Sequence, residues 1–385
     1  MTHSTTRSIL HLVGSPTDDF FCELSLLYAR DCLSATADAS RYEFIIAYVT
    51  PDGFWRFPAS LQSEDIANAP AVTLSAAIAF LDAQSIDAAL PQMFCLAGMT
   101  AYRSLLNLLK IPYVGNLPGQ MALTADKAKT KAIVAAAGVR VPHGELLHQS
   151  TQTPTITPPA IVKPNAGDNS VGITLVEESA DYPAALEAAF AVFSANSSVD
   201  SADNSSVEAS GVIVEEFIPL GREVRCGVVE YKGELICLPL QEYRLDAQTN
   251  PIRRHEDKLK RNEQDDLDFA AKTNDRAWML PVDDPAVSPT WEAAKKCHRA
   301  LGCRHYSLYD FRIDADGKPW FIEAGLYCSF SPKSVLVSMM EAHGISLLEF
   351  FKQSVEAVLP TSPVPLNADQ LEADTETARD LVGAM

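Results

Sequence analysis

Short apolar segments alternate with helical stretches over residues 1–120, and this alternation limits the possible folds more than any other feature. Ile9–Val13 and Phe44–Val49 are typical of buried strands, while Phe20–Leu33 has helical spacing. Strands that alternate with helices predict a parallel sheet in an α/β layer. No Gly-x-Gly-x-x-Gly turn follows these strands, so the main fingerprint of a dinucleotide-binding fold is missing. The remaining elements expected in this segment are strands at Ala88–Phe94 and Ile111–Val114 and a helix at Met99–Leu109.

The pattern changes after residue 120, where hairpins follow the helices. Two hairpins are expected, at Glu223–Arg244 and Tyr306–Ala324. Ser194–Gly211 is rich in Ser, Asp and Asn, which is typical of a flexible surface insertion. We therefore predict an N-terminal α/β domain (1–120), a central domain with the insertion (121–211), a C-terminal domain (212–362) and an acidic tail (363–385). The other expected elements are helices at Leu123–Ala137, Tyr182–Phe193 and Pro289–Leu301 and strands at Ala160–Lys163, Ile173–Val176 and Val212–Glu216.

Composition excludes some partners. The chain has 385 residues, of which 47% are hydrophobic, enough for more than one core. Its 31 basic and 50 acidic residues give a net charge of −19, which disfavours binding to nucleic acid. Ile9–Val13 is too short for a signal sequence or a membrane span. The eight cysteines form no Cys-x-x-Cys pair, so we expect reduced thiols and a cytoplasmic protein with no membrane partner.

The second hairpin carries two carboxylates that could act together. We expect a four-residue loop at Asp314–Gly317, which places Asp310 opposite Phe321. Glu323 then follows two positions later on the same face, and such diagonal neighbours lie about 7–8 Å apart. Two carboxylates at that spacing can hold hard cations that are bound to phosphate oxygens. The alternative is a surface hairpin with ordinary solvated acids.

Two further segments suggest a site for a nucleotide. Lys163 ends an apolar strand, where an ammonium group is costly unless it reaches an anion. The loop Gly167–Gly172 has small and polar residues whose N–H groups could fold over phosphates, although such loops are often simple turns. The strand Val212–Ile218 could present its edge to adenine, and Glu223 could accept hydrogen bonds from ribose, although a glutamate at a strand end is usually solvated.

Taken in order along the chain, these residues resemble the ATP-grasp superfamily, and within it the D-alanine–D-alanine ligase group. The similarity runs from Ile111 to Leu348. The family's fold is α/β, with three α/β domains and ATP held between two antiparallel sheets. The resemblance rests on Ile111–Asn116, Asp126-Lys127, Ile161–Pro164, Asn169–Gly172, Val214-Glu215, Asp310 and Glu323.

The resemblance implies ATP and Mg²⁺ as cofactors, and it assigns residues to them. Asp310 and Glu323 would hold the magnesium ions. The ATP-binding set would be Lys127 and Lys163 at the phosphates, Asn169 and Ser170 in the glycine loop, Glu215, Glu216 and Ile218 at adenine, and Glu223 at ribose.

The sequence also departs from those ligases. Their Glu-x-Asn motif is Glu323-Ala-Gly325 here, so one metal ligand is missing. The arginine that stabilises an acyl oxyanion in those enzymes is replaced by Leu308, and Arg312 and Arg225 are the two candidates to take its place. The D-alanine-binding turn near the N-terminus is absent from Val13–Glu23. A first substrate bulkier than D-alanine is therefore expected.

The pattern is similar to that of the branch that joins an amino acid to mycosporine-glycine. In that branch a cyclohexenone oxygen is phosphorylated, and the amine of Ser, Thr or Gly then forms an imine. We assign catalytic roles to Arg312, Lys258 and Ser329. Substrate binding is assigned to Arg225, Ser331, Lys333 and Ser334, although each serine could instead cap a helix or brace a loop. The resemblance rests on Leu90–Cys95, Gly221–Gly227, Cys303–Ser307 and Glu323–Phe330.

Two other functions remain open at this level. One is a related ligase that makes a dipeptide or another amide, including D-alanine–D-alanine ligase itself. The other is a nucleotide-binding protein without turnover, a hypothesis that Leu308 and Gly325 keep alive. The sequence does not decide which amino acid is preferred or whether the chain forms a homodimer.

Overall fold

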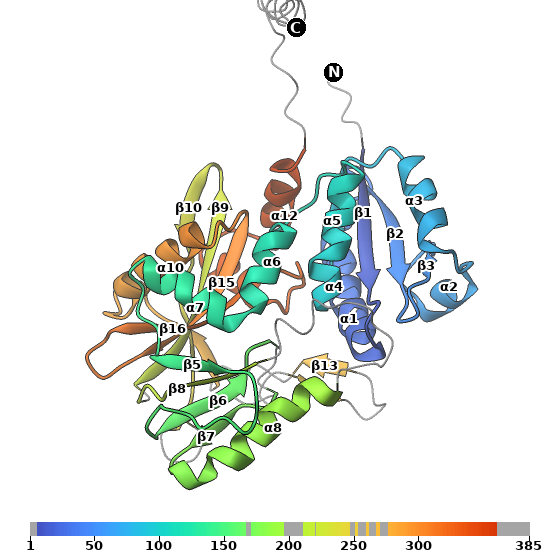
Figure 1. The fold of residues 1–385 in the computed structure, drawn as a ribbon. Helices are drawn as coiled ribbons and strands as arrows, with labels where there is room; N and C mark the ends of the chain where they lie inside the picture. The colour runs from blue at the N-terminus through green and yellow to red at the C-terminus, as the bar shows by residue number, and fades with distance from the viewer. Residues whose placement is uncertain are drawn as a thin grey trace, which may run out of the picture.

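A computed structural model describes most of the chain. The described residues are 6–166, 171–195, 211–219, 221–246, 251–252, 259–261, 267–269 and 276–359. They form three α/β domains, as predicted (Figure 1). Most of the expected insertion, the acidic tail, and three predicted site residues (Asn169, Ser170 and Lys258) lie outside the described residues. No helix in the described part of the chain is both long and apolar enough to cross a membrane.

The N-terminal domain is built on a four-stranded sheet in the order β3-β2-β1-β4. β1 pairs in parallel with β2 and with β4, which confirms the parallel layer, and β3 adds an antiparallel edge. The strand expected at Ile111–Val114 is wrong, because only an isolated bridge joins Ala89 to Tyr113. The strands are β1 (Arg7–Gly14), β2 (Tyr42–Val49), β3 (Trp55–Arg56) and β4 (Ala88–Pro91).

The helices of this domain begin at side-chain caps or short turns. Asp18 accepts a hydrogen bond from the Phe21 N–H at 2.8 Å and so caps α1. The helix expected at Met99–Leu109 is present as α5, but it begins at Ala101, because the backbone of Thr100 (φ −118°, ψ −76°) separates it from the short helix α4 that ends at Met99. The helices are α1 (Asp19–Thr36), α2 (Ser63–Asn68), α3 (Leu74–Asp82), α4 (Leu96–Met99) and α5 (Ala101–Leu108).

The middle domain is a four-stranded antiparallel sheet in the order β5-β8-β6-β7, which packs against one long helix, α8. β8 lies between β5 and β6, so the domain boundary predicted at residue 212 comes one strand too early. The elements are β5 (Gly144–Leu147), β6 (Ala160–Pro164), β7 (Thr174–Val176), η1 (Ser179–Asp181), α8 (Tyr182–Ala195) and β8 (Val212–Glu216).

The C-terminal domain contains the larger sheet, in the order β14-β11-β9-β15-β16 with β10 on β9. The predicted hairpin turn at Tyr231–Gly233 is confirmed, with positive φ at Lys232 and Gly233. The strands are β9 (Arg222–Tyr231), β10 (Glu234–Cys237), β11 (Gln241–Tyr243), β14 (Ala277–Met279), β15 (Tyr306–Ile313) and β16 (Pro319–Gly325); β12 (Leu259–Arg261) pairs separately with β13 (Leu267–Phe269).

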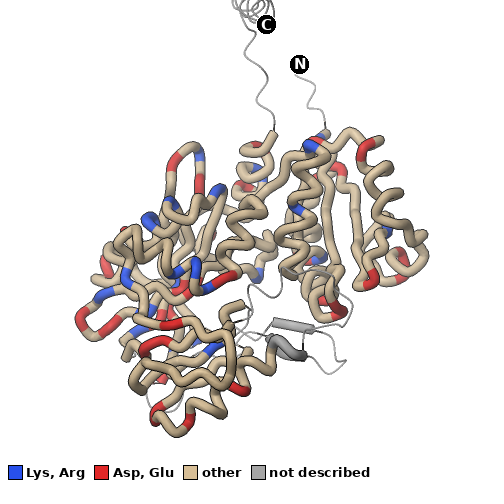
Figure 2. Tube along the Cα trace, in the orientation of Figure 1, with Lys and Arg blue, Asp and Glu red and all other residues tan. Residues whose placement is uncertain are grey.

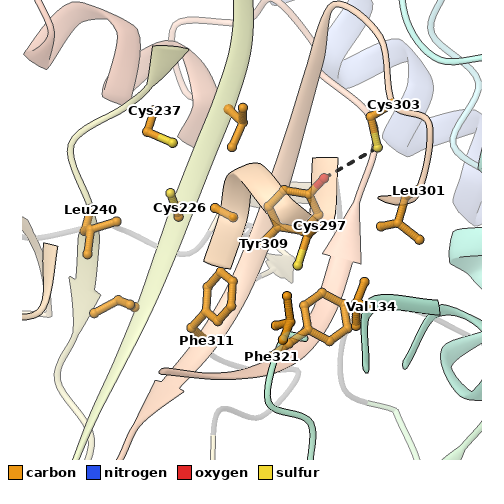
Figure 3. Packing of buried hydrophobic residues seen from close by; sticks show 14 of the residues in the cluster. Val134, Cys226, Cys237, Leu240, Cys297, Leu301, Cys303, Tyr309, Phe311 and Phe321 are labelled. Carbon is orange, nitrogen blue, oxygen red and sulfur yellow. Dashed lines mark hydrogen bonds between the residues drawn. The ribbon is translucent and has the colours of Figure 1, made fainter. Parts of the chain in front are cut away.

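Helices from two parts of the chain cover one face of this sheet. Tyr309, Phe311 and Phe321 point from the strands into a core that also receives Val134 from α7 and Cys297 from α10 (Figure 3). The segment that we assigned to the central domain therefore begins with two helices, α6 and α7, that pack on the C-terminal domain. The helices are α6 (Pro118–Ala125), α7 (Lys127–Ala136), α10 (Val287–Ala300), α11 (Val335–Ala342) and α12 (Leu347–Glu356).

The register of the second hairpin differs from the prediction. Ile313 pairs with Pro319 rather than Lys318, so the turn is one residue longer than expected. A β-bulge between Asp310 and Phe311 then shifts the register again, and Asp310 lies directly opposite Glu323. Without the bulge, Asp310 would face Ile322, and the two carboxylates would lie on opposite faces of the sheet.

Candidate active site

A pocket of about 710 Å³ separates the middle sheet from the uncovered face of the C-terminal sheet. Strand alternation explains its lining, because Val224 and Phe311 point into the core while their neighbours point into the pocket. Figure 2 shows acidic and basic positions next to one another in all three domains. The charged side chains that line the pocket are Lys163, Glu215 and Glu216 from the middle domain and Glu223, Asp310, Arg312 and Glu323 from the C-terminal sheet.

Two lysines meet one glutamate at the wall of this pocket. Lys163 Nζ lies 2.5 Å from one carboxylate oxygen of Glu215, and Lys131 Nζ contacts the other. All three side chains are buried. Burial alone would raise the pKa of Glu215, but the two ammonium groups outweigh it and hold this pKa below its usual range. The cluster therefore carries more positive than negative groups in a site that excludes water.

Arg312 lies at the end of the pocket where the two domains join. Its Nη1 donates to the Ile218 carbonyl at 3.1 Å, and its Nη2 donates to Glu223 at 3.0 Å. The guanidinium also lies 5.1 Å from the centre of the Phe217 ring. The Nε of Arg312 is buried without a hydrogen-bond partner. This arrangement joins Ile218, just after β8, to Glu223, which was predicted to bind ribose.

Arg225 forms a bidentate ion pair with Asp310. Its Nε and Nη2 lie 2.5 Å and 3.1 Å from the two carboxylate oxygens. Burial opposes the charge on Arg225, yet the Asp310 carboxylate raises the pKa of this guanidinium well above its usual range. Leu308, at the strand position where the related ligases have their oxyanion arginine, pairs with Gly227, while Arg225 pairs with Asp310 two positions further along β15.

The residues of the pocket fit a nucleotide with its metal ions. The excess positive charge at Lys131 and Lys163 suits phosphate groups, and the buried Nε of Arg312 offers one more donor. Asp310 and Glu323 are cross-strand partners on the pocket face, as two oxygen ligands for a hard cation must be. Within the described residues, no group of three or more His, Cys, Asp or Glu side chains could hold a metal, so the remaining ligands would come from phosphate and water.

A second pocket of about 450 Å³ adjoins the first at Glu323. Lys127, Gly325 and Tyr327 line it. A Cβ added to Gly325 would meet nothing nearer than Tyr327 at 3.8 Å, so the space beside this glycine is open. Lys127 was predicted to contact the phosphates, and the structure places it in the lining of this second pocket and not of the first.

Aromatic rings from the N-terminal domain lie behind the second pocket. The ring of Phe94 lies 5.7 Å from that of Tyr327 and 5.0 Å from that of Tyr28 in α1. Burial raises the pKa of Tyr28 to about 12, and Arg225 is close enough to act on it in the opposite direction. Of these three rings only Tyr327 lines the second pocket, and Phe94 and Tyr28 pack behind it.

The loop after β16 has partners that sequence reasoning missed. Ser331 is fully buried, and its Oγ donates to Asp31 of α1 at 3.0 Å. Lys333 Nζ lies 3.7 Å from the same carboxylate. In this structure both groups hold an aspartate of the N-terminal domain rather than a substrate carboxylate, because the loop docks on α1. The other two serines with predicted roles, Ser329 and Ser334, lie before and after Ser331 in the same loop.

Ser329 and Ser334 have different surroundings. Ser329 is buried, its Oγ has no hydrogen-bond partner, and its carbonyl accepts a bond from Gln92 at 2.5 Å. Ser334 precedes α11 and makes no side-chain capping bond, while its Oγ lies 4.0 Å from the Cys328 sulfur. Neither serine lines the nucleotide pocket or the second pocket. Their assignment to catalysis and substrate binding stays a prediction.

Two further residues were missed although a signal was present. Lys131 follows Lys127 by four positions in the predicted helix, which places both on one helical face. Asn165 follows Lys163 by two positions. Its Oδ1 accepts from the Ala128 N–H at 2.9 Å, so this residue ties β6 to the start of α7.

The comparison with protein families decides where the chain belongs. Residues 140–356 match the family model described as the D-ala D-ala ligase C-terminus, which is more than half of the chain. The chain belongs to the D-alanine–D-alanine ligase family. The ligases of this family are ATP-dependent enzymes that form carbon–nitrogen bonds and use ATP and Mg²⁺, and the chain is a member of this enzyme class.

Curated relatives match this chain over most of its length. A D-alanine–D-alanine ligase of Halalkalibacterium halodurans is 28% identical over 67% of this chain and 76% of its own length. The corresponding ligase of Nocardia farcinica is 29% identical over 86% of this chain and 93% of its own. Identities of this size leave room for a different substrate.

Solved structures share the architecture. The VanG D-Ala:D-Ser ligase from Enterococcus faecalis superposes with a TM-score of 0.72 at 22% identity and covers 92% of this chain and 100% of that chain. A D-alanine–D-alanine ligase from Bacillus anthracis, solved as a complex with ATP, gives a TM-score of 0.63 at 19% identity, over 92% and 97% of the two chains. These likenesses confirm the fold of three α/β domains.

Proposed function

We propose that the chain is an ATP-dependent ligase that joins an amino acid (Ser, Thr or Gly) to mycosporine-glycine through a phosphorylated intermediate. The observation that supports this substrate is the second pocket, where Gly325 leaves open space beside the ring of Tyr327. A flat conjugated ring can stack on this tyrosine, whereas the small methyl group of D-alanine does not fill the space.

The nucleotide end of the reaction uses the pocket between the sheets. In this proposal Ile218 and Glu215 face adenine, Glu223 takes the ribose, and the lysine cluster binds phosphate oxygens. Asp310 and Glu323 would hold Mg²⁺, which neutralises charge on the transferring phosphoryl group. The pocket's position between two domains lets the middle domain close over the phosphates and exclude water.

The chemistry follows in two balanced steps. The ring carbonyl oxygen attacks the γ-phosphorus of ATP, the bond to the β,γ-bridging oxygen breaks, and ADP leaves. The amine nitrogen then attacks the ring carbon, inorganic phosphate leaves, and loss of the amine protons gives the imine. Lys127, which lines the second pocket, would stabilise the phosphorylated oxygen.

The replacement of an oxyanion arginine by Leu308 supports this route. A ligase that activates a carboxylate passes through a tetrahedral oxyanion that needs a fixed positive charge. Arg225 lies opposite Asp310, two positions from Leu308 along β15, and Asp310 holds it through its Nε and Nη2. The site therefore provides less for an acyl oxyanion than for a ring oxygen that becomes a phosphate ester.

The second candidate is a ligase that joins two amino acids. It is favoured by the names of the relatives, which are D-alanine–D-alanine ligases. Under this alternative the open space beside Gly325 would receive a second amino acid with a larger side chain. Catalysis in the cytoplasm is part of both proposals, and the eight free cysteines are consistent with it.

One assay separates the two candidates. Purified protein is incubated with MgATP and with mycosporine-glycine, serine, both together, or pairs of D-amino acids, and ADP release is measured. The proposal expects ADP only when mycosporine-glycine is present, together with a product whose ultraviolet absorption shifts to longer wavelength when serine is added. ADP release with amino-acid pairs alone would overturn it and favour the second candidate.

A third outcome concerns binding without catalysis. Tight MgATP binding with no ADP release under any of these conditions would point to a nucleotide-binding protein and would contradict both ligase proposals. Lys163→Ala serves as the control for contaminating ATPase, because it removes a lysine from the pocket wall.

A further inference from the structure

Lys131 lies behind the nucleotide pocket rather than in its lining. Its ammonium group reaches Glu215 from α7, while Lys163 reaches the same carboxylate from β6. The three residues come from a helix that packs on the C-terminal domain and from two strands of the middle sheet. The contact of Lys131 with Glu215 thus crosses from one domain to the other, at the point where they meet.

The cluster has an unequal charge count. Two ammonium groups and one carboxylate leave one positive charge, and none of the three side chains is more than a tenth exposed. A single buried positive charge without a counter-ion is strongly unfavourable. The protein can remove this cost in two ways, by releasing a proton from one lysine or by accepting an anion beside the cluster. Burial and the neighbouring Lys163 lower the pKa of Lys131 to about 7, with Glu215 acting in the opposite direction.

We propose that Lys131 is a positioning residue that takes up a proton when ATP binds, so that the phosphate charge completes the Lys131–Glu215–Lys163 cluster. Lys131 fixes Glu215 against α7 and leaves Lys163 free to move toward the phosphates. This inference rests on the assignment of ATP to the pocket in the proposed function.

Other charged groups surround the cluster and are expected to act less strongly. Lys127 shares the helical face of Lys131 but lines the second pocket. Across the nucleotide pocket, Asp310 is held by Arg225 and Glu223 by Arg312, so these charges are already balanced in pairs. The remaining acidic groups at the pocket are Glu216, whose carboxylate accepts from the His143 N–H, and Glu323.

The direction of the proton exchange on ATP binding follows from this charge balance. Above pH 7 Lys131 is mostly neutral in the protein without nucleotide, and negatively charged phosphates favour its protonated form. ATP binding at pH 8 should therefore take up a proton, and the affinity should weaken as the pH rises. At pH 6 the lysine is already protonated, and the uptake should vanish.

Calorimetry tests this directly. MgATP is titrated into the wild-type protein at pH 8 in two buffers of different ionisation enthalpy, and the difference in heat gives the number of protons bound. We expect an uptake of about 0.5–1 proton per ATP at pH 8 and close to none at pH 6. Lys131→Gln should lose this uptake. Lys131→Arg should also lose it but keep its affinity at high pH, since a guanidinium stays charged.

The control is Lys129→Gln, which alters a lysine of the same helix whose side chain is 60% exposed. This variant should keep the wild-type proton uptake. Equal uptake in wild type and Lys131→Gln would overturn the inference while leaving the nucleotide pocket intact. Failure of MgATP to bind the wild type would contradict the proposed function instead. The wild-type measurement decides the matter even if Lys131→Gln does not fold.

Discussion

The two ends of the active site are built on different principles. At the nucleotide end, charged side chains are bound in pairs across neighbouring strands of the C-terminal sheet, as Arg312 is to Glu223 and Arg225 is to Asp310. At the acceptor end, most of the lining is apolar or small, and Gly325 leaves open space. The first end is tightly constrained, because an unpaired buried charge is costly. The second can change its side chains with little effect on folding.

This difference explains where the sequence departs from the peptide ligases. The pocket at the nucleotide end is lined by four residues that match the family, Lys163, Glu215, Asp310 and Glu323. Substitution of Lys163, Glu215 or Asp310 would upset a buried ion pair. The departures at Leu308 and Gly325 lie at the acceptor end. We therefore expect substitutions at the two ends to affect different kinetic constants.

The largest effect is expected from Lys163→Ala. Loss of this ammonium leaves Glu215 with Lys131 alone and removes a phosphate ligand, so kcat/KM for ATP should fall about 10²–10³-fold. The protein should stay folded, because the remaining pair still balances its charge. ADP release and a circular-dichroism melting curve measure the two effects. An active, folded variant would show that the phosphate assignment is wrong.

A smaller loss is expected from Asp310→Asn. The amide cannot balance Arg225 and is a poor metal ligand, so activity should fall about 100-fold and need more Mg²⁺. Magnesium titrations of ADP release measure this. Glu242→Gln is a matched control, because that carboxylate pairs with Arg222 away from the proposed metal position. If both variants lose activity equally, Asp310 is acting only as an ion-pair partner.

Gly325→Asn should affect the acceptor end alone. The added side chain occupies the open space beside Tyr327, so KM for the acceptor should rise about tenfold while KM for ATP stays unchanged. Gly325→Ala is the milder control, since its Cβ makes only ordinary contacts. A tenfold change in KM for ATP would mean that the two ends are not separable.

The smallest effect concerns stability and pH. The pKa of Lys131 is about 7 in the folded protein, below its value of about 10.4 in an unfolded chain. Between these values the unfolded chain binds more protons, so stability should rise with pH through this window, at about 1 kcal/mol per pH unit. Urea unfolding at pH 7 and pH 8.5 should show this rise in the wild type and a smaller one in Lys131→Gln. An identical rise in both would remove Lys131 as its source.

Much of the architecture could be predicted because its signals are local. The apolar strands Ile9–Val13 and Val212–Glu216 and the turn at Lys232-Gly233 are set by neighbours within a few residues, and the structure confirms them. The domain limits could not be predicted in the same way. β8 lies between β5 and β6, and α7 packs against the C-terminal sheet, and both facts depend on partners far along the chain.

The candidate site also combines features that local sequence predicts with contacts that depend on distant parts of the chain. The order and spacing of the motifs predicted four of the site residues, Lys163, Glu215, Asp310 and Glu323. Their partners are not, because Arg225 and Lys131 reach these groups from other elements. Asp31 is the clearest case, since it meets Ser331 across 300 positions of sequence.

The sequence by itself determined which side chains are available at the nucleotide end and that the two hairpin carboxylates could share a face. Only the tertiary structure decided how they do so. The turn is one residue longer than the simple pattern predicts, and the β-bulge beside Asp310 restores the match with Glu323. A bulge depends on how the whole sheet twists and packs, and for that reason local sequence did not reveal it.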